Sequence, residues 1–568
     1  MPPEPVTVSS PKIISIRPAR PRNTTSAPRV RCTRTSSSKR RSGSPEISGG
    51  GPPQQTERPN IAMAKSRSIS RAPPFPPYTR AAADCKPDPG LTRRRGATSM
   101  RRMARHVLIL GGGLAGMSCA LACARAGLPV TVLEREEEVG GLARSFSQDG
   151  FTFDFGPHRL FSQQPELIQG LSDLLGGDLT SRDRRSRIFL KGKFFHYPLR
   201  VGNAIFSMPP LTTARILLDY GGAKAAGLVR RKTDRSFEDW VKARFGATLY
   251  RIFFQQYTEK AWGIPCHTIS ADWASQRISL LSLWDTFKKS VWRRGDQPRT
   301  YASSFHYPRT GGIGRIARVM AAEVERLGGR IRRSCPVEAI RVHDRRVTDV
   351  RAGGETFPAD EVVSTLPITD FVRFLGPSAP EDARRAAAAL TFRAIVFVYL
   401  FLDRPSLSDD HWIYLPENRF LSNRLSESRN FSEDNAPPGK TVVCAEITCA
   451  VGDALWRMSD ADLSARVRED LLGLGFAAIR PEEILAVRTI RAPECYPIYD
   501  IGYRERVDAV LQHCNRISNL LPIGRSALFR YNNMDHSIDM GQRAARALLG
   551  QTRREDALSV ASGAQYFG

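Results

Sequence analysis

The fold is decided by the stretch HVLILGGGLAG, residues 106–116. Its first five residues predict a buried parallel strand, and the alanine-rich segment that continues to about Ala126 predicts a helix. Between them, Gly111 permits a tight turn, Gly113 lets the backbone approach a pyrophosphate, and Gly116 lets the helix pack on the strand. This strand, loop and helix predict a dinucleotide-binding turn, with the amide groups of the helix N-terminus directed at the phosphates.

The residues after this turn indicate whether the cofactor is FAD or NAD. A second predicted strand, 129–133, is followed directly by Glu134. This residue lies 18 positions beyond Gly116, close to the spacing at which a carboxylate binds ribose hydroxyls. The segment GGLAR (140–144) follows. It resembles the extended fingerprint of the FAD-binding amine oxidase superfamily, in which such glycines and the arginine wrap the pyrophosphate and the ribityl chain. The alternative is a solvated acidic turn with a surface arginine.

The remaining pattern predicts an α/β fold in two parts. A Rossmann-like FAD-binding domain is assembled from separated segments, and an α+β substrate domain has an antiparallel sheet and a helical insertion. Strands are expected at 394–402, 441–449 and 483–491, and a helix at 540–549. The expected limits are 1–103 for a disordered basic tail, 104–202, 301–368 and 516–552 for the FAD-binding domain, 203–300 for the helical insertion, 369–515 for the substrate domain, and 553–568 for a closing tail.

The positive charge is concentrated at the amino-terminal end. The 568 residues carry a net charge of +27, of which residues 1–105, with 22 basic and 5 acidic side chains, supply +17. This segment is too poor in apolar residues to offset its ordering entropy. It is either an arm that binds anions, an Arg/Ser-rich transit peptide, or an overcalled start. We favour the last hypothesis, because Met100 and Met103 lie just upstream of the first strand.

Several function classes are not expected. No run of apolar residues approaches the roughly 18 of a membrane span, so we expect no integral membrane segment and a cytoplasmic protein. The ten cysteines include no C-x-x-C pair, which indicates buried thiols. Asp535 and His536 alone do not make a metal site, and we expect no metal. No module for reading nucleic acid is visible.

Five further segments carry a closer resemblance. They are GPHRLFS (156–162), YTEKAWG (257–263), GGIG (311–314), WIYLPE (412–417), and the closing group of GR (524–525), RY (530–531) and DHS (535–537). Together and in this order they resemble the UDP-galactopyranose mutases, with protoporphyrinogen oxidase and amine oxidases as more distant relatives. The resemblance spans residues 105–550.

The resemblance implies a set of site residues. His158 is similar to a histidine beside the flavin ring, Arg424 to an arginine that clamps the substrate diphosphate, and Arg525 to one that lines the flavin and sugar side; these three form the implied catalytic set. Residues implied for substrate binding are Tyr197, Arg277, Tyr414, Arg424, Tyr496 and Tyr531. Residues expected to bind FAD are Gly111, Gly113, Leu114, Ala115, Gly116, Glu134, Arg135, Gly141, Leu142, Arg144, His158, Val337, Arg525, Asp535 and Ser537.

Each assignment has a simpler alternative. Trp412 and Tyr414 are also compatible with ordinary sheet packing, and Arg424 with a solvated loop. Lys260 is expected on an exposed helix surface. Fungal-type mutases have an aromatic residue and a glutamine after Tyr-Pro, whereas this chain has Leu199 and Arg200 there. The resemblance therefore does not extend to the pocket that binds the uridine base.

Two activities follow from the resemblance. In the first, a phosphorylated or nucleotide-linked sugar is isomerised by reduced FAD, with the flavin as nucleophile and NAD(P)H or another donor as the source of electrons. In the alternative, an oxidoreductase of the amine oxidase or protoporphyrinogen oxidase type, oxidised FAD accepts hydride from a small molecule. The same fingerprint serves both, because a fold does not fix a function. The oligomeric state is left open.

Overall fold

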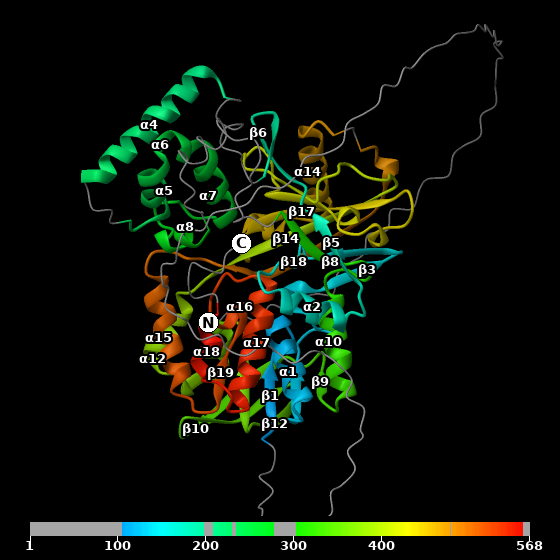
Figure 1. Cartoon of the computed structure of the whole chain (residues 1–568), viewed down its shortest axis with the longest axis vertical. Helices are drawn as coiled ribbons and strands as arrows, with labels where there is room; N and C mark the ends of the chain where they lie inside the picture. Colours follow the sequence, from blue (N-terminus) through cyan, green and yellow to red (C-terminus); the bar gives the residue numbers. More distant parts are fainter. Residues whose placement is uncertain (1–104, 198–207, 230–233, 278–302, 477–478, 561–568) are drawn as a thin grey trace, which may run out of the picture. The chain divides into compact units, whose positions relative to one another are not determined.

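The structure is a computed structural model that describes residues 105–197, 208–229, 234–277, 303–476 and 479–560 (Figure 1). All of these residues belong to one compact unit. The predictions for the tail of residues 1–103, for Leu199 and Arg200, and for part of the helical insertion lie outside the described residues.

A parallel sheet carries the first predicted strand. Its five strands run in the order β19-β13-β1-β2-β9, and every neighbouring pair is parallel. All residues of β1, β2 and β13 are buried, as expected for a sheet covered on both faces. The strands come from distant parts of the sequence and span β1 (Val107–Leu110), β2 (Val130–Leu133), β9 (Arg330–Arg332), β13 (Glu361–Ser364) and β19 (Leu520–Pro522).

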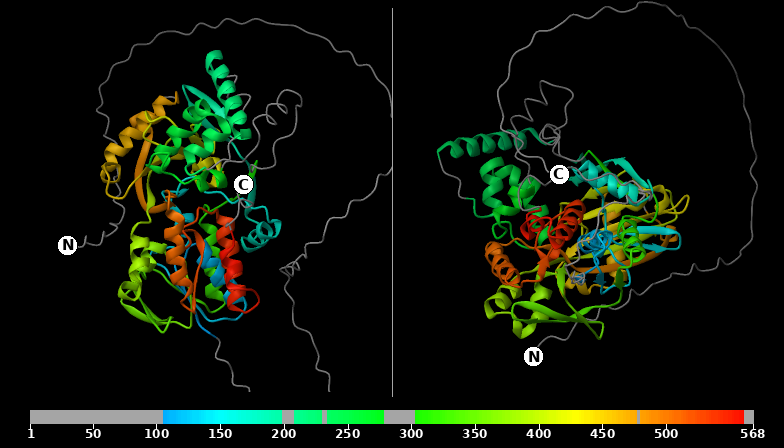
Figure 2. Two further views of the ribbon diagram at one scale, coloured as in Figure 1. Left: turned by 90° about the vertical axis from the view of Figure 1, so that its left-hand side faces the viewer. Right: turned by 60° about the horizontal axis from the view of Figure 1, so that its bottom comes forward.

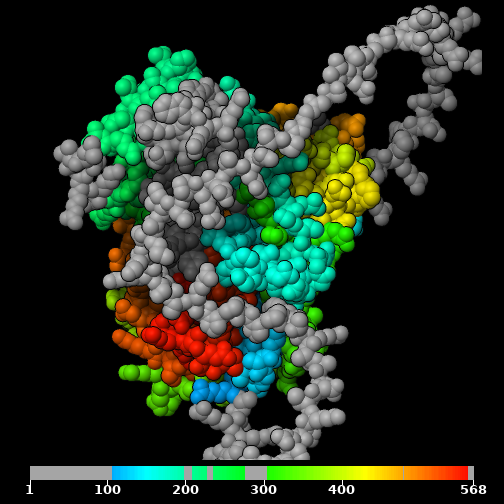
Figure 3. Space-filling model, in the orientation of Figure 1, coloured from blue at the N-terminus to red at the C-terminus, as the bar shows by residue number. Residues whose placement is uncertain are grey.

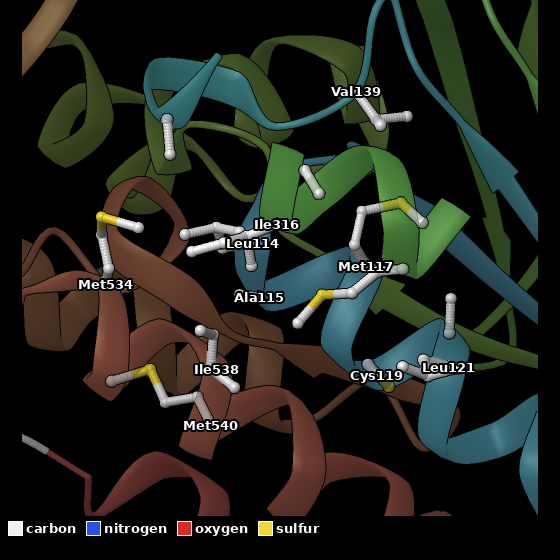
Figure 4. Close-up of a cluster of buried hydrophobic side chains, with 14 of the residues drawn as sticks. Leu114, Ala115, Met117, Cys119, Leu121, Val139, Ile316, Met534, Ile538 and Met540 are labelled. Carbon is white, nitrogen blue, oxygen red and sulfur yellow. The ribbon is translucent and has the colours of Figure 1, made fainter. Parts of the chain in front are cut away.

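Three helices pack together beside this sheet. Helix α1 (Leu114–Arg125) contacts both α10 (Arg315–Arg326) and α17 (Met534–Leu548). Figure 4 shows Leu114 and Met117 of α1 between Ile316 of α10 and Ile538 of α17. In the space-filling view the last segment, in red, lies against the first, in blue (Figure 3). The parallel sheet is therefore covered only when both ends of the described chain are in place.

A second sheet of seven strands has the order β18-β14-β17-β16-β15-β6-β7. All neighbouring pairs are antiparallel except β15 and β6. Its register aligns Tyr414, Arg424 and Glu446 on three adjacent strands. The strands span β6 (Ser186–Leu190), β7 (Lys193–His196), β14 (Phe392–Leu402), β15 (Trp412–Tyr414), β16 (Arg424–Glu427), β17 (Thr441–Cys449) and β18 (Ile484–Pro497).

A helical group forms between residues 210 and 277. Ser236 caps α5 in a capping box, because its side chain accepts from Asp239 N while the Asp239 carboxylate accepts from Ser236 N. Figure 2 shows this group in green. Its elements are α4 (Pro210–Val229), α5 (Phe237–Phe245), α6 (Ala247–Leu249), a π-helix η2 (Tyr250–Gln255), α7 (Gln256–Trp262) and α8 (Ala271–Arg277).

Smaller elements complete the fold. The other strands are β3 (Ser145–Gln148), β4 (Phe151–Asp154), β5 (Leu179–Asp183), β8 (Ser304–Pro308), β10 (Val337–His343), β11 (Arg346–Ala352) and β12 (Glu355–Pro358). The other α-helices are α2 (Pro165–Leu174), α11 (Ile368–Leu375), α12 (Glu381–Ala388), α13 (Ala454–Arg457), α14 (Asp460–Gly473), α15 (Tyr503–Asn515), α16 (Gly524–Ala527) and α18 (Arg554–Leu558), and short 3₁₀ turns are η1 (Gly141–Ala143), η3 (Gly376–Ser378), η4 (Ser428–Asn430), η5 (Glu433–Asn435) and η6 (Pro481–Glu483).

Two predicted boundaries were wrong. The helix expected at 540–549 begins at Met534, because Asn533 precedes it as the N-cap and Asn533 N donates to His536 Nδ1 at 3.1 Å. The strand expected to end at 491 continues to Pro497 by pairing with β14, including Tyr496 with Arg393. A local cap thus extends the helix, and pairing with a distant strand extends β18, in each case beyond the apolar pattern.

Candidate active site

A cavity of about 2540 Å³ lies where the glycine turn, the seven-stranded sheet and the helical group meet. Pockets for one ligand have volumes of roughly 300–1000 Å³, so this cavity has room for a cofactor and a substrate together. The predicted residues that line it are Gly111, Gly113, Leu114, Ala115, Glu134, Arg135, Gly141, Leu142, Arg144, His158, Tyr197, Val337, Tyr414, Arg424, Tyr496, Arg525, Tyr531 and Ser537.

The glycine turn has the shape that a pyrophosphate needs. Gly111 adopts φ +98°, in the left-handed region. A Cβ on Gly116 would lie 2.1 Å from Gly111 O, so only glycine lets α1 pack here, whereas a Cβ on Gly113 would meet no atom within 4 Å. The open side of Gly113 faces the cavity at the N-terminus of α1, where no side chain caps the free amide groups.

The predicted ribose-binding carboxylate is held in place. Glu134 is buried; its Oε2 accepts from Gly112 N at 2.7 Å and its Oε1 from Glu136 N at 3.0 Å. Arg144 donates from Nε to Gly141 O at 3.1 Å, and its Nη1 lies 3.1 Å from Glu136 Oε2. These contacts hold the acidic turn against the glycine loop. The residues present at this end of the cavity therefore fit an FAD nucleotide.

Two predicted site residues lie elsewhere, and the prediction for a third, Arg277, falls outside the described side chains. Gly116 does not line the cavity, because it is packed under the turn. Asp535 is buried away from the cavity lining, and Ser537 lines the cavity instead. The two residues are two positions apart on α17, about 200° around a helix, so both cannot face the same space. Arg277 lies at the end of α8, and its side chain is outside the described part.

Arg424 is paired with a carboxylate that the sequence reasoning missed. Its Nε and Nη2 donate to Glu446 Oε1 and Oε2, each at 2.7 Å, and the Glu446 side chain is 5% exposed. The register of β16 and β17 places the two residues opposite each other. A lone glutamate in the apolar strand TVVCAEITC (441–449) was the available signal, because an unpaired carboxylate is rarely buried.

Arg525 is also committed to partners within the chain. Its guanidinium donates to Cys495 O through Nε at 3.1 Å and Nη2 at 2.7 Å, and to Asn532 O through Nη1 at 3.0 Å. It lies 5.1 Å from the ring centre of Tyr496 and 4.3 Å from that of Tyr531. The two tyrosine rings are stacked, 5.2 Å apart with an interplanar angle of 15°. Arg525 thus fixes this tyrosine pair as one wall of the cavity.

His158 is neutral at physiological pH. Burial, followed by the charges of Arg424 and Arg525, lowers its pKa to about 4. Its Nδ1 is buried and has no hydrogen-bond partner among the described residues. Burial likewise raises the pKa of Tyr257 and of Tyr496 well above the usual value, so both hydroxyls keep their protons. This end of the cavity therefore offers two protonated phenol hydroxyls and one neutral imidazole.

Lys260, expected on an exposed helix surface, is instead partly buried next to the site. Its ammonium group donates to the carbonyl oxygens of Leu415 at 3.0 Å, Glu417 at 3.2 Å and Ser422 at 2.7 Å. Burial lowers its pKa to about 8. The three carbonyls belong to the turn between β15 and β16, so Lys260 positions the strands that carry Tyr414 and Arg424.

Within the described ranges, no group of three or more histidine, cysteine, aspartate or glutamate side chains is arranged to hold a metal ion. No described helix is both long enough and apolar enough to span a membrane. The eight described cysteines are buried free thiols.

The glycine turn, the acidic turn and the adjoining large cavity define a flavoenzyme. The chain belongs to the flavin-containing amine oxidoreductase family, whose model matches residues 114–549. FAD is the cofactor that this family implies, and the family resemblance expected from the sequence is confirmed.

Individual relatives are distant. The 4,4'-diapolycopene oxygenase of Methylomonas sp. is 24% identical over 360 residues, covering 58% of this chain and 70% of that protein. The 4,4'-diaponeurosporene oxygenase of Staphylococcus aureus (strain USA300) is 24% identical over 301 residues, covering 48% of this chain and 58% of its own length.

Solved structures share the fold. A reduced UDP-galactopyranose mutase gives a TM-score of 0.71 at 22% identity and covers 82% of this chain and 100% of that chain. A protein assigned as a protoporphyrinogen oxidase from Exiguobacterium sp. 255-15 gives 0.62 at 18% identity and covers 79% and 99%. At these identities the likeness concerns the fold alone.

Proposed function

We propose that the chain is an FAD-dependent oxidoreductase that oxidises a small molecule held at the tyrosine-lined end of the cavity. When bound, FAD supplies the hydride acceptor. The chain itself supplies position: the tyrosine pair braced by Arg525 forms one wall, and Tyr257 and Tyr496 present protonated hydroxyls. The oxygenase names of the curated relatives agree with redox chemistry.

The Arg424–Glu446 pair is the observation that carries this proposal. A mutase would need Arg424 to clamp the diphosphate of its substrate. Arg424 Nε and Nη2 already donate to the Glu446 carboxylate at 2.7 Å, and this ion pair carries no net charge. A diphosphate would have to displace a buried carboxylate or lie beside it, and either costs electrostatic free energy.

A mutase is the second candidate. It is supported by the TM-score of 0.71 with reduced UDP-galactopyranose mutase and by the ordered segments that resemble that family. In that case the substrate would be a nucleotide-linked sugar, the enzyme would work only with reduced FAD, and NAD(P)H or another donor would reduce it.

The two candidates differ in electron balance. For the oxidoreductase, anaerobic mixing of oxidised holoenzyme with substrate should bleach the flavin band, and oxygen should restore it. We would test 4,4'-diapolycopene, protoporphyrinogen IX and benzylamine by stopped-flow absorbance. Conversion of UDP-galactopyranose to its furanose isomer by dithionite-reduced holoenzyme, with the flavin staying reduced and no bleaching by the other three compounds, would contradict the proposal.

A matched pair of tyrosine variants links the test to the cavity. Tyr496→Phe removes a hydroxyl from the cavity wall and should slow flavin reduction by the active compound at least tenfold. Tyr250→Phe removes a buried hydroxyl that donates to Glu238 outside the cavity lining and should leave the rate unchanged. FAD content, read from the absorbance of the purified proteins, should be equal in both.

We also propose the domain roles expected from the sequence. Segments 104–202, 301–368 and 516–552 would form the FAD-binding domain, because they supply all five strands of the parallel sheet. The residues between them would form the substrate domain, whose seven-stranded sheet is extended by β6 and β7 of the first segment. Limited proteolysis with and without FAD would test whether FAD protects the FAD-binding domain more than the substrate domain.

A further inference from the structure

Arg159 is a cation that the described chain leaves without a counter-ion. It makes no hydrogen bond or ion pair with any described residue, and its Nη1 is buried without a partner. Its guanidinium lies 5.2 Å from the ring centre of Trp412. The side chain lines the large cavity next to His158. A buried charge without a partner is unfavourable, so its presence in a cavity calls for a ligand that compensates it.

The backbone holds Arg159 rigidly. The next residue, Leu160, exchanges two hydrogen bonds with His306, donating at 3.0 Å and accepting at 2.7 Å. Leu160 is fully buried. The ring beside the guanidinium, that of Trp412, is 2% exposed and belongs to strand β15. The charge is therefore placed in advance rather than carried by a freely moving side chain.

The surroundings favour an anion. Burial is the main cause that lowers the pKa of the Arg159 guanidinium, and the charges of Arg184 and Arg424 lower it further. Tyr197 and Tyr414, whose rings are 5.1 Å apart, are also electrostatic neighbours of Arg159. Glu446, the buried carboxylate of this region, is already engaged by Arg424. Arg184 donates to Tyr197 O at 3.3 Å and lies 5.4 Å from the centre of the Tyr197 ring. Two cations and two phenol groups thus face one region of the cavity.

We propose that Arg159, assisted by Arg184, binds an anionic group of the substrate, a carboxylate or a phosphate. A planar guanidinium matches the oxygen geometry of either group. This inference rests on the proposed function, in that the tyrosine-lined end holds the substrate. It narrows the substrate class: a neutral polyene or a simple amine has no group for this site, whereas a molecule with an acidic substituent does.

The test measures binding of simple anions to the FAD-loaded enzyme. Benzoate and inorganic phosphate are titrated by calorimetry, with benzamide as the neutral analogue of benzoate. We expect at least one of the anions to bind, and Arg159→Gln to raise its Kd at least tenfold without changing the response to benzamide. Arg159→Lys should restore part of the affinity. Arg185→Gln, at a side chain that is 65% exposed, is the matched control and should bind as wild type.

The same variants give a second, independent readout. Without added anion, Arg159→Gln should raise the thermal unfolding midpoint above that of wild type, because it removes an uncompensated charge. Preference for benzoate identifies a carboxylate ligand, and preference for phosphate a phosphate ligand. Binding of neither anion, equal Kd values in wild type and Arg159→Gln, or a lowered midpoint would overturn the proposal. These measurements involve no electron transfer, so they can fail while hydride transfer succeeds, and the reverse.

Discussion

At the residue scale, Gly113 and Gly116 separate cofactor binding from folding. Gly113 has φ −67° and ψ 173°, which alanine adopts freely, and its Cβ would meet no protein atom. Gly113→Ala should therefore change the unfolding free energy of the apo-protein by no more than about 0.5 kcal/mol. It should weaken FAD binding at least tenfold, because the methyl group enters the space expected for the pyrophosphate. Flavin fluorescence titration measures the affinity.

Gly116→Ala is the counterpart. Its Cβ would lie 2.1 Å from Gly111 O, so the helix must move away from the turn. We expect a loss of about 1–3 kcal/mol in apo-protein stability together with loss of FAD. Urea unfolding of the two apo-variants distinguishes them. If Gly113→Ala binds FAD as tightly as wild type, the pyrophosphate does not approach this residue.

At the scale of elements, Lys260 on α7 connects the helical group to the seven-stranded sheet. Lys260→Met should destabilise the protein by about 2–3 kcal/mol, because three carbonyl oxygens between β15 and β16 lose a charged donor. Substrate oxidation should slow as well, since this turn positions Tyr414 and Arg424.

The control is Lys224→Met, at an exposed residue of α4. It should shift the urea midpoint far less, within about 0.5 kcal/mol. Equal effects of the two substitutions would show that the contacts of Lys260 contribute no particular stability.

The same elements show how far the sequence predicts the site. The glycine turn and the strand 441–449 depend on residues near one another in sequence, and each was predicted. The Arg424–Glu446 pair depends on the register between two strands, and the burial of Lys260 on a helix meeting a turn 155 or more residues away. Such pairings are set by tertiary packing, which short-range patterns do not encode.

At the scale of the whole molecule, Asp154 predicts a pH dependence of stability. It joins its own hairpin to a distant part of the chain: Ser145 Oγ and Tyr307 OH donate to its carboxylate at 2.5 and 2.6 Å, and Ile313 N at 3.2 Å. Burial raises the pKa of Asp154 from 3.8 to about 6, only partly opposed by these hydrogen bonds. The folded state therefore binds the proton more tightly than the unfolded state.

The stability that this proton contributes is full below pH 4 and is lost as the pH rises through 6. The loss is roughly 3 kcal/mol, from 1.36 kcal/mol per pKa unit. Because His158, with its lowered pKa, gives an opposite slope between pH 4 and 6.5, the comparison must be between wild type and Asp154→Asn. Their difference in unfolding free energy should change across pH 4–6; a constant difference would contradict the assignment.

The parallel sheet has a consequence for synthesis of the protein. Strand β1 ends at Leu110, whereas β19 and α17, which complete the sheet and cover α1, begin at Leu520 and Met534. At about 5–20 residues per second, a ribosome needs roughly 20–80 s to make the intervening chain. During that interval the apolar surfaces of α1 and β13 that contact α17 and β19 are not yet covered. The nascent chain should therefore depend on chaperones, and flavin should be captured only after translation is nearly complete.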